Sequence, residues 1–110
     1  MFEKDLTQSL LLDVYGDILP ERKRTVLEMY YNEDFSLAEI ADEIGISRQG
    51  VRDIIKKTEN ELHFLEEKLG LAQKFRDIQH HTERLKALLG ELKADDPVKQ
   101  ELDALANSVK

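Results

Sequence analysis

The clearest chemical signature in this chain is a set of charged side chains that recur at helical spacing within residues 47–58. They are four cations and one acid, a net charge of +3: Arg48, Arg52, Lys56, Lys57 and Asp53. An arginine can hold guanine O6 and N7 with two donors, and a glutamine can pair with adenine N6 and N7. Lysine ammonium groups suit phosphate. These residue types predict contacts to the base edges and the backbone of a nucleic acid.

The position of each side chain along the predicted helix indicates its role. The candidates, in chain order, are Arg48, Gln49, Arg52, Lys56 and Lys57. The first turns of a recognition helix face base edges, so we assign the first three candidates to bases and the two lysines to the backbone. Asp53 could accept from cytosine N4. The alternative is that both arginines are solvated surface residues bonded to Asp53 or Glu43.

The segment that positions these side chains runs from Ser36 to Glu59 and has the spacing of a helix-turn-helix. Gly45 supplies a turn with positive φ between two predicted helices. Ser36 begins the first helix in a capping box with Glu39, and Ser47 caps the second. The inward stripes are apolar: Ile40, Ala41, Ile44, Val51, Ile54 and Ile55. Because helix N-termini bind anions, Ser36 and Ser47 are also candidate nucleic-acid contacts.

The overall charge is −7, which is unusual for a chain that binds nucleic acid. Exposed charges are screened beyond roughly 8 Å at physiological salt, so a local basic patch can still touch phosphates. The acidic remainder should weaken non-specific binding. A second basic run, Arg22 to Arg24, is typical of a solvated helix face. Gly50 lies inside the predicted recognition helix, where it costs about 1 kcal/mol relative to alanine.

Apolar residues repeat at spacings of three and four along the rest of the chain, and no run alternates as a strand would. We therefore predict an all-α fold. A first helix is expected to bury an apolar stripe from Leu6 to Ile18. A second helix, which begins at Pro20, is expected to bury a stripe from Val26 to Tyr31. We divide the chain into a helix-turn-helix domain, residues 1–69, and a C-terminal helical extension, residues 70–110.

The extension carries a heptad-like apolar seam after Gly70, in which Thr82 is the one polar interruption. Its members are Leu71, Phe75, Ile78, Leu85, Leu89 and Leu92. Asp96 and Pro97 are expected to begin a last helix as its N-cap and first residue. Two interpretations stay open: the extension folds back onto its own domain, or its seam contacts a second copy or another partner.

Several classes of function lack the residues that they need. The chain has no cysteine, which excludes disulfides and thiolate metal sites. His63, His80 and His81 do not share a helix face with further ligands, so no metal site is predicted. The sequence contains no glycine loop for phosphate, no nucleophile elbow and no segment that reads as a leader or a membrane span. We expect a cytoplasmic protein without catalytic residues or cofactors.

The stretch LPERKRTVLEMYYNEDFSLAEIADEIGISRQGVRDIIKKTENEL resembles region 4 of bacterial sigma factors, which places a helix in the major groove of promoter DNA. From Leu11 to about Phe75 the chain is more similar to the YlxM family of small helix-turn-helix proteins. The stretch YYNEDFSL and the acid Asp53 favour YlxM over sigma. The resemblance implies a sigma region 4-like all-helical fold and either a place in the signal recognition particle pathway or a regulatory role.

The residues and the resemblance together predict a DNA-binding helix-turn-helix regulatory protein that acts, as the resemblance implies, in the signal recognition particle pathway. The alternative is a protein-interaction or assembly factor of that pathway, which would use the apolar C-terminal helices. A third possibility is an RNA binder whose basic face grips shape, phosphates or a loop. Components of the signal recognition particle and a second copy of the chain are therefore both candidate partners.

Overall fold

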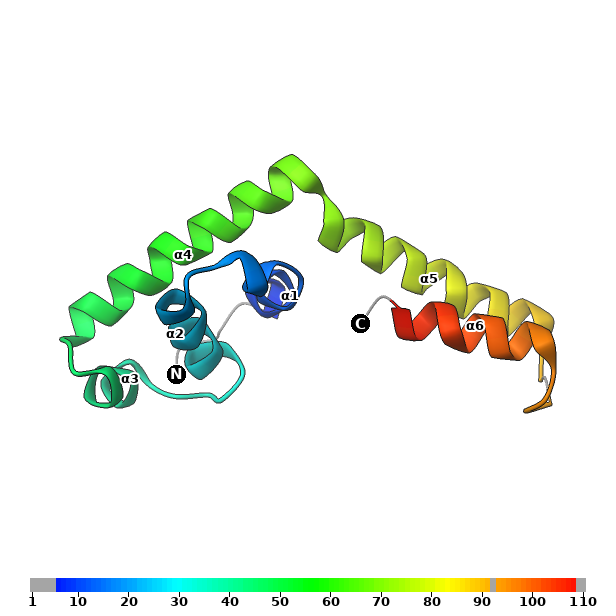
Figure 1. Ribbon diagram of the computed structural model, residues 1–110, viewed down its shortest axis with the longest axis horizontal. Coiled ribbons are helices and arrows are strands. Elements are labelled where there is room, and N and C mark those ends of the chain that lie inside the picture. Colours follow the sequence, from blue (N-terminus) through cyan, green and yellow to red (C-terminus); the bar gives the residue numbers. More distant parts are fainter. Residues whose placement is uncertain (1–5, 92, 109–110) are drawn as a thin grey trace. The chain divides into compact units, whose positions relative to one another are not determined.

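A computed structural model of the 110-residue chain describes residues 6–91 and 93–108. This part of the chain is helical throughout and contains no strand, which confirms the predicted all-α class (Figure 1). Its elements are α1 (Leu6–Tyr15), η1 (Gly16–Ile18), α2 (Glu21–Tyr31), α3 (Leu37–Ile44), α4 (Arg48–Leu69), α5 (Leu71–Leu89) and α6 (Pro97–Ser108). The chain divides into two units, one ending at Gly70 and one beginning at Leu71.

The first unit is built around α4, which contacts α1, α2 and α3. The long helix lies across the three shorter ones (Figure 1). Side chains that are less than 2% exposed form the centre of this unit: Tyr15, Val26, Leu27, Ile40, Val51, Thr58 and Leu62. The Thr58 hydroxyl donates to the Ile54 carbonyl at 2.7 Å, so a polar group is satisfied inside an apolar core. These side chains pack α4 against the other helices of the unit from Val51 to Leu62.

The stripe predicted for the first helix differs in the structure at its end. Ile18 was expected to be buried, but its side chain is 63% exposed, and Leu19 is buried instead. The reason is that α1 stops at Tyr15 and the chain continues as the 3-10 turn η1. A 3-10 turn has 3.0 residues per turn, so it rotates the following residues out of the α-helical register. Tyr31, also predicted as buried, is only half-buried.

The turns around α3 follow the predicted local chemistry. The Ser36 hydroxyl accepts from the Glu39 amide at 3.1 Å, and the Ser36 amide donates to the Glu39 carboxylate at 3.0 Å, which completes the capping box. Gly45 ends α3 with φ 75°, a left-handed conformation that favours glycine. The Ser47 hydroxyl then accepts from the Gly50 amide at 3.0 Å and caps α4. Each of these predictions is confirmed.

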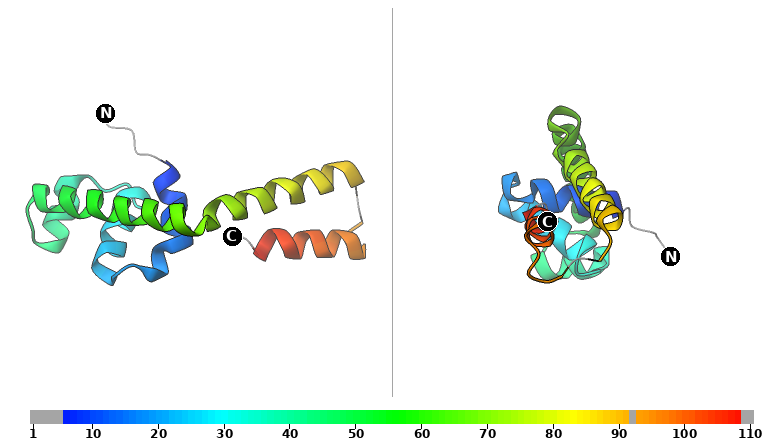
Figure 2. Two further views of the ribbon diagram at one scale, coloured as in Figure 1. Left: turned by 90° about the horizontal axis from the view of Figure 1, so that it is seen from above. Right: turned by 90° about the vertical axis from the view of Figure 1, so that its right-hand side faces the viewer.

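The second unit is a hairpin of α5 and α6, which lie side by side in both views of Figure 2. Asp96 caps α6, since its carboxylate accepts from the Val98 amide at 2.8 Å, as predicted. The buried side chains of the described hairpin are few: Ala72, Thr82 and Leu102. Among the described residues, no helix is both long enough and apolar enough to span a lipid bilayer.

Candidate nucleic-acid interface

Helix α4 carries the predicted recognition residues on two adjacent ridges. Residues four apart on an α-helix follow one another along its surface. One ridge is Arg48, Arg52 and Lys56, and the next is Gln49, Asp53 and Lys57; all six side chains are exposed. With a rise of 1.5 Å per residue, the first ridge is about 12 Å long. The structure thus brings five of the predicted contacts onto one end of one rigid helix.

The second ridge lies opposite the buried stripe of α4, and the first ridge lies between that ridge and the stripe. That stripe consists of Val51, Ile55, Thr58 and Leu62, which pack against the other helices of the unit. Side chains on the far face of a helix whose inner face is packed must point to solvent. The packing of the core therefore decides which face of α4 is available to a ligand.

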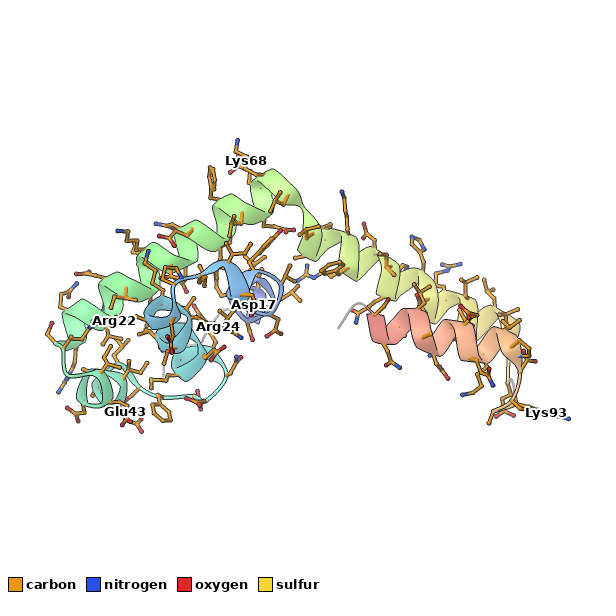
Figure 3. All side chains as sticks on the ribbon, in the orientation of Figure 1. Asp17, Arg22, Arg24, Glu43, Lys68 and Lys93 are labelled. Carbon is orange, nitrogen blue, oxygen red and sulfur yellow. The ribbon has the colours of Figure 1, made fainter. Side chains whose placement is uncertain are left out.

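The cations at the start of α4 form no ion pair with any described residue. Within the described residues, no carboxylate lies at ion-pair distance from any of the four cations in the first turns of α4: Arg48, Arg52, Lys56 and Lys57. Glu43, one of the acids proposed to hold the arginines, lies on the side of α3 that is turned away from α4 (Figure 3). The alternative in which Asp53 or Glu43 binds the arginines is therefore not seen.

Two of the three cations in the other basic run of this unit, Lys23 and Arg24, behave differently. Lys23 forms an ion pair with Glu61 at 2.7 Å. Arg24 contacts Asp17 at 2.7 Å and Glu28 at 2.9 Å, and the bond to Glu28 followed by the charge of Asp17 raises the pKa of its guanidinium. Figure 3 shows Arg24 and Asp17 close together. These two cations are thus paired with carboxylates of the same unit, in contrast to the four cations at the start of α4. Arg22, the third cation of the run, is exposed and has no ion pair among the described residues.

Asp53 is engaged by its own ridge. Its Oδ1 accepts from Gln49 Nε2 at 2.9 Å, one helical turn away. The acid is therefore held beside the predicted base-reading glutamine and does not contact an arginine. In the free protein the Gln49 amide already spends one of its two donors on this bond.

Ser36 and Ser47 serve mainly as helix caps. The amide and the hydroxyl of Ser36 are both bonded to Glu39, whose carboxylate places a negative charge at the start of α3. A carboxylate there competes with a phosphate for the same free amides. Ser47 has no such acid in its first turn, and its hydroxyl hydrogen stays available to a ligand while its oxygen caps α4. Of the two, Ser47 is the better placed to meet a phosphate.

Arg52 also influences the interior. Tyr30 on α2 is 7% exposed, and its burial raises the pKa of its phenol. The charge of Glu59 raises this pKa further, whereas the charge of Arg52 lowers it. Glu59 also accepts a hydrogen bond from the hydroxyl of Tyr31. The basic ridge therefore gives way to an acid two turns beyond Arg52, which limits it to the first turns of α4.

Gly50 has a structural explanation within the motif. A Cβ at this position would lie 3.2 Å from Ile46 Cδ1 and 3.3 Å from Ser47 Oγ, tighter than about nine in ten real Cβ contacts, so these side chains would have to shift by a few tenths of an ångström. The missing side chain therefore makes room for Ile46, which lies in the turn between α3 and α4, and for the cap of α4. This packing accounts for a residue that weakens helices by about 1 kcal/mol elsewhere.

An apolar groove lies beside the basic face, and the sequence pattern does not predict it. Its volume is about 480 Å³, and its walls come from the end of η1, the link to α2 and the middle of α4: Ile18, Leu19, Pro20, Lys57, Asn60, Glu61, Phe64 and Leu65. Phe64 is 58% exposed, and Lys68 Nζ lies 5.7 Å from the centre of its ring. Phe64 lies outside the buried stripe of α4. An aromatic residue at such a position is the feature of the sequence that could have indicated the groove. Lys57 belongs both to the second ridge and to the wall of this groove.

The predicted seam lies on α5, with one exception. Leu92 is outside the described residues. Phe75 is half-buried, and the others are between 36% and 48% exposed: Leu71, Ile78, Leu85 and Leu89. Thr82, the polar interruption, is buried and donates its hydroxyl hydrogen to the Ile78 carbonyl at 2.7 Å. In the described part of the chain, no cluster of acids and histidines is suited to a metal ion.

Known proteins resemble the chain in both units. A family model described as "Putative helix-turn-helix protein, YlxM / p13 like" matches residues 2–104. A UPF0122 protein of Bacillus cereus (strain AH187) is 41% identical over 106 residues, which cover 96% of each protein. One from Thermoanaerobacter sp. (strain X514) is 36% identical over 107 residues, 94% of this chain and 92% of the relative. One from Caldanaerobacter subterraneus is 46% identical over 81 residues, which cover 74% of this chain and 69% of the relative.

Proposed function

The chain belongs to the YlxM / p13-like family of helix-turn-helix proteins, and we propose that it binds duplex DNA through the first turns of α4. In this proposal Arg48 and Arg52 read base edges, and Gln49 joins them when its bond to Asp53 opens. Lys56 and Lys57 contact phosphates, and so does the hydroxyl of Ser47. An α-helix fits the major groove of B-form DNA, where every base pair presents a distinct pattern of donors and acceptors.

One contrast carries the proposal. The first unit pairs Lys23 and Arg24 with carboxylates and leaves Arg22 of α2 unpaired, but only α4 gathers four exposed cations without an ion pair among the described residues: Arg48, Arg52, Lys56 and Lys57. Unpaired cations on a rigid helix are what phosphate binding requires, because binding then releases counterions without first breaking internal ion pairs. The acids elsewhere in the unit disfavour long, non-specific contacts, so the expected footprint is short and selective.

DNA is favoured over RNA by the shape of the interface. The deep and narrow major groove of A-form RNA excludes an α-helix, and RNA-binding modules often stack unpaired bases on aromatic side chains. The two ridges contain no aromatic residue: Arg48, Arg52, Lys56, Gln49, Asp53 and Lys57. A regulatory role and a place in the cytoplasmic signal recognition particle pathway extend the proposal, and these rest on the family resemblance alone.

The test is selection of ligands from random-sequence libraries of duplex DNA and of RNA, each offered to the full chain. We expect enrichment of a short duplex DNA motif. Each bidentate arginine contributes about 1–3 kcal/mol, so the double variant Arg48→Ala/Arg52→Ala should lose roughly 30-fold or more in affinity for that motif. The matched control is Arg76→Ala/Arg84→Ala, which removes two exposed arginines from α5 and changes the net charge equally.

The outcomes separate the candidate functions. Equal losses in both double variants would show that only net charge matters and would contradict groove reading by α4. Enrichment of RNA alone would replace DNA by RNA as the ligand. Enrichment of neither, with a folded protein by circular dichroism, would leave protein interaction through the apolar side chains of α5 and α6 as the function to pursue.

A further inference from the structure

The α5–α6 hairpin has two unlike sides. On one side, Lys86 of α5 and Asp103 of α6 form an ion pair at 2.9 Å, and Lys99 adds a second contact to Asp103 at 3.2 Å. The buried side chains Thr82 and Leu102 mark the seam between the two helices. Successive residues on a helix are turned by about 100°. The positions of Lys86 and Thr82 on α5 therefore show which side of α5 faces away from the ion pair, and those of Asp103 and Leu102 show the same for α6.

The other side of the hairpin is apolar. Leu85 precedes Lys86 by one residue, and Leu105 follows Asp103 by two, so both are turned away from the ion pair and flank the seam. Ile78 and Val98 lie seven residues before Leu85 and Leu105 and extend the same surface. We call these four residues the apolar side; their side chains are between 36% and 47% exposed.

We propose that the apolar side of the hairpin packs against the same side of a second copy of this chain, so that two hairpins close a four-helix bundle. A helix pair with one apolar surface is half of such a bundle, and the stable solution for it is to bury that surface against further helices. An isologous pairing about a two-fold axis requires only one self-complementary surface.

The charge distribution favours a second copy over other occupants. Residues 71–110 hold seven cations and seven anions, whereas residues 1–70 hold nine and sixteen, so the whole net charge of −7 lies outside the hairpin. Two neutral hairpins approach without electrostatic repulsion. Lys74 and Glu101, each one helical turn from a member of the apolar side, bring one charge of each sign to its edge, so this surface selects neither an acidic nor a basic partner, whereas the ion-paired side is already satisfied. A second hairpin is therefore the occupant that this surface favours.

Light scattering of the full chain at increasing concentration tests the pairing. We expect twice the mass of one chain, falling to the mass of one chain in the variant Leu85→Glu/Leu105→Glu. The matched control, Ala87→Glu/Ala104→Glu, introduces the same charges at exposed positions on the same two helices but off the apolar side, and should keep the dimer. Circular dichroism shows whether each variant keeps its helices.

Cysteine cross-linking gives a second measurement that does not depend on a disruptive substitution. Because the chain has no cysteine, each single variant offers one thiol. Under oxidation we expect disulfide-linked dimers from at least one of Ile78→Cys, Leu85→Cys and Leu105→Cys, and only background from Ala87→Cys and Ala104→Cys. A wild type that stays monomeric, a dimer that survives Leu85→Glu/Leu105→Glu, or equal cross-linking at the control positions would each overturn the proposal.

Discussion

Gln49 donates its side-chain amide to Asp53 on the exposed face of α4, with 2.9 Å between Nε2 and Oδ1. The two residues lie on one ridge, directly beside Arg48 and Arg52. A bond of this kind holds the glutamine in one orientation and places a negative charge where a phosphate or base would approach. The pair therefore restricts what the start of α4 can bind, and it can be altered without touching the core.

Asp53→Asn is expected to strengthen binding to duplex DNA of arbitrary sequence. The change removes one negative charge from the face of the cations, and a single exposed charge contributes up to about 1 kcal/mol, so we expect a gain of about two- to fivefold at low salt. Fluorescence anisotropy with a labelled random duplex measures the gain. The control is Asp77→Asn on α5, where Asp77 accepts from Gln73 at the same 2.9 Å. Equal gains would mean that Asp53 has no special position.

Ser47 can be tested as a cap and as a phosphate contact separately. Ser47→Ala should lower the free energy of unfolding by about 1 kcal/mol, because the Gly50 amide loses its acceptor. Ser47→Asp should keep the cap, since aspartate is an equally good acceptor, but should repel a phosphate. Denaturant unfolding and DNA titration of both variants give the two readouts. DNA affinity that is unchanged in Ser47→Asp would remove Ser47 from the interface.

The phenol of Tyr30 should report the charge of Arg52. Arg52→Ala removes a cation that lowers the pKa of Tyr30, so this pKa should rise further above its ordinary value. Because the folded state has the raised pKa, the stability linked to this group is complete below the ordinary phenol pKa and is lost as the pH rises through the folded value. NMR titration of the Tyr30 ring measures the pKa.

Arg48→Ala is the control for this experiment. It removes the same charge one turn earlier on the same ridge, and Arg48 is not among the charges that shift Tyr30. We therefore expect the Tyr30 pKa to stay where it is in the wild type. A fall of this pKa in Arg52→Ala would contradict the placement of Arg52 beside α2.

Lys56→Ala should flatten the salt dependence of DNA binding. Each phosphate that is neutralised adds about 0.9 to the slope of log affinity against log salt, so the slope should drop by about one if Lys56 contacts a phosphate. Lys68→Ala is the control, because Lys68 lies at the other end of α4 above Phe64 (Figure 3). The measurement is a set of anisotropy titrations at several salt concentrations. An equal drop in both variants would show a diffuse charge effect.

The local features of the motif could be predicted from the chain alone. The capping box of Ser36, the left-handed Gly45 and the cap at Ser47 each depend on residues within three or four positions. Short-range geometry of this kind is set by backbone conformation and by the neighbouring side chain, both of which are visible in the sequence. The face of α4 that carries Arg48 and Arg52 follows from the same periodicity.

Contacts between helices could be decided only by the tertiary structure. Lys23 and Glu61 are 38 positions apart, and only the packing of α2 against α4 shows that Lys23 is neutralised while Arg52 is not. The 3-10 turn that exposes Ile18 is likewise absent from the apolar spacing. The sequence by itself determined the helices, their caps and the direction of the basic face, because these are local; which charges stay free depends on distances that exist only once the helices have packed.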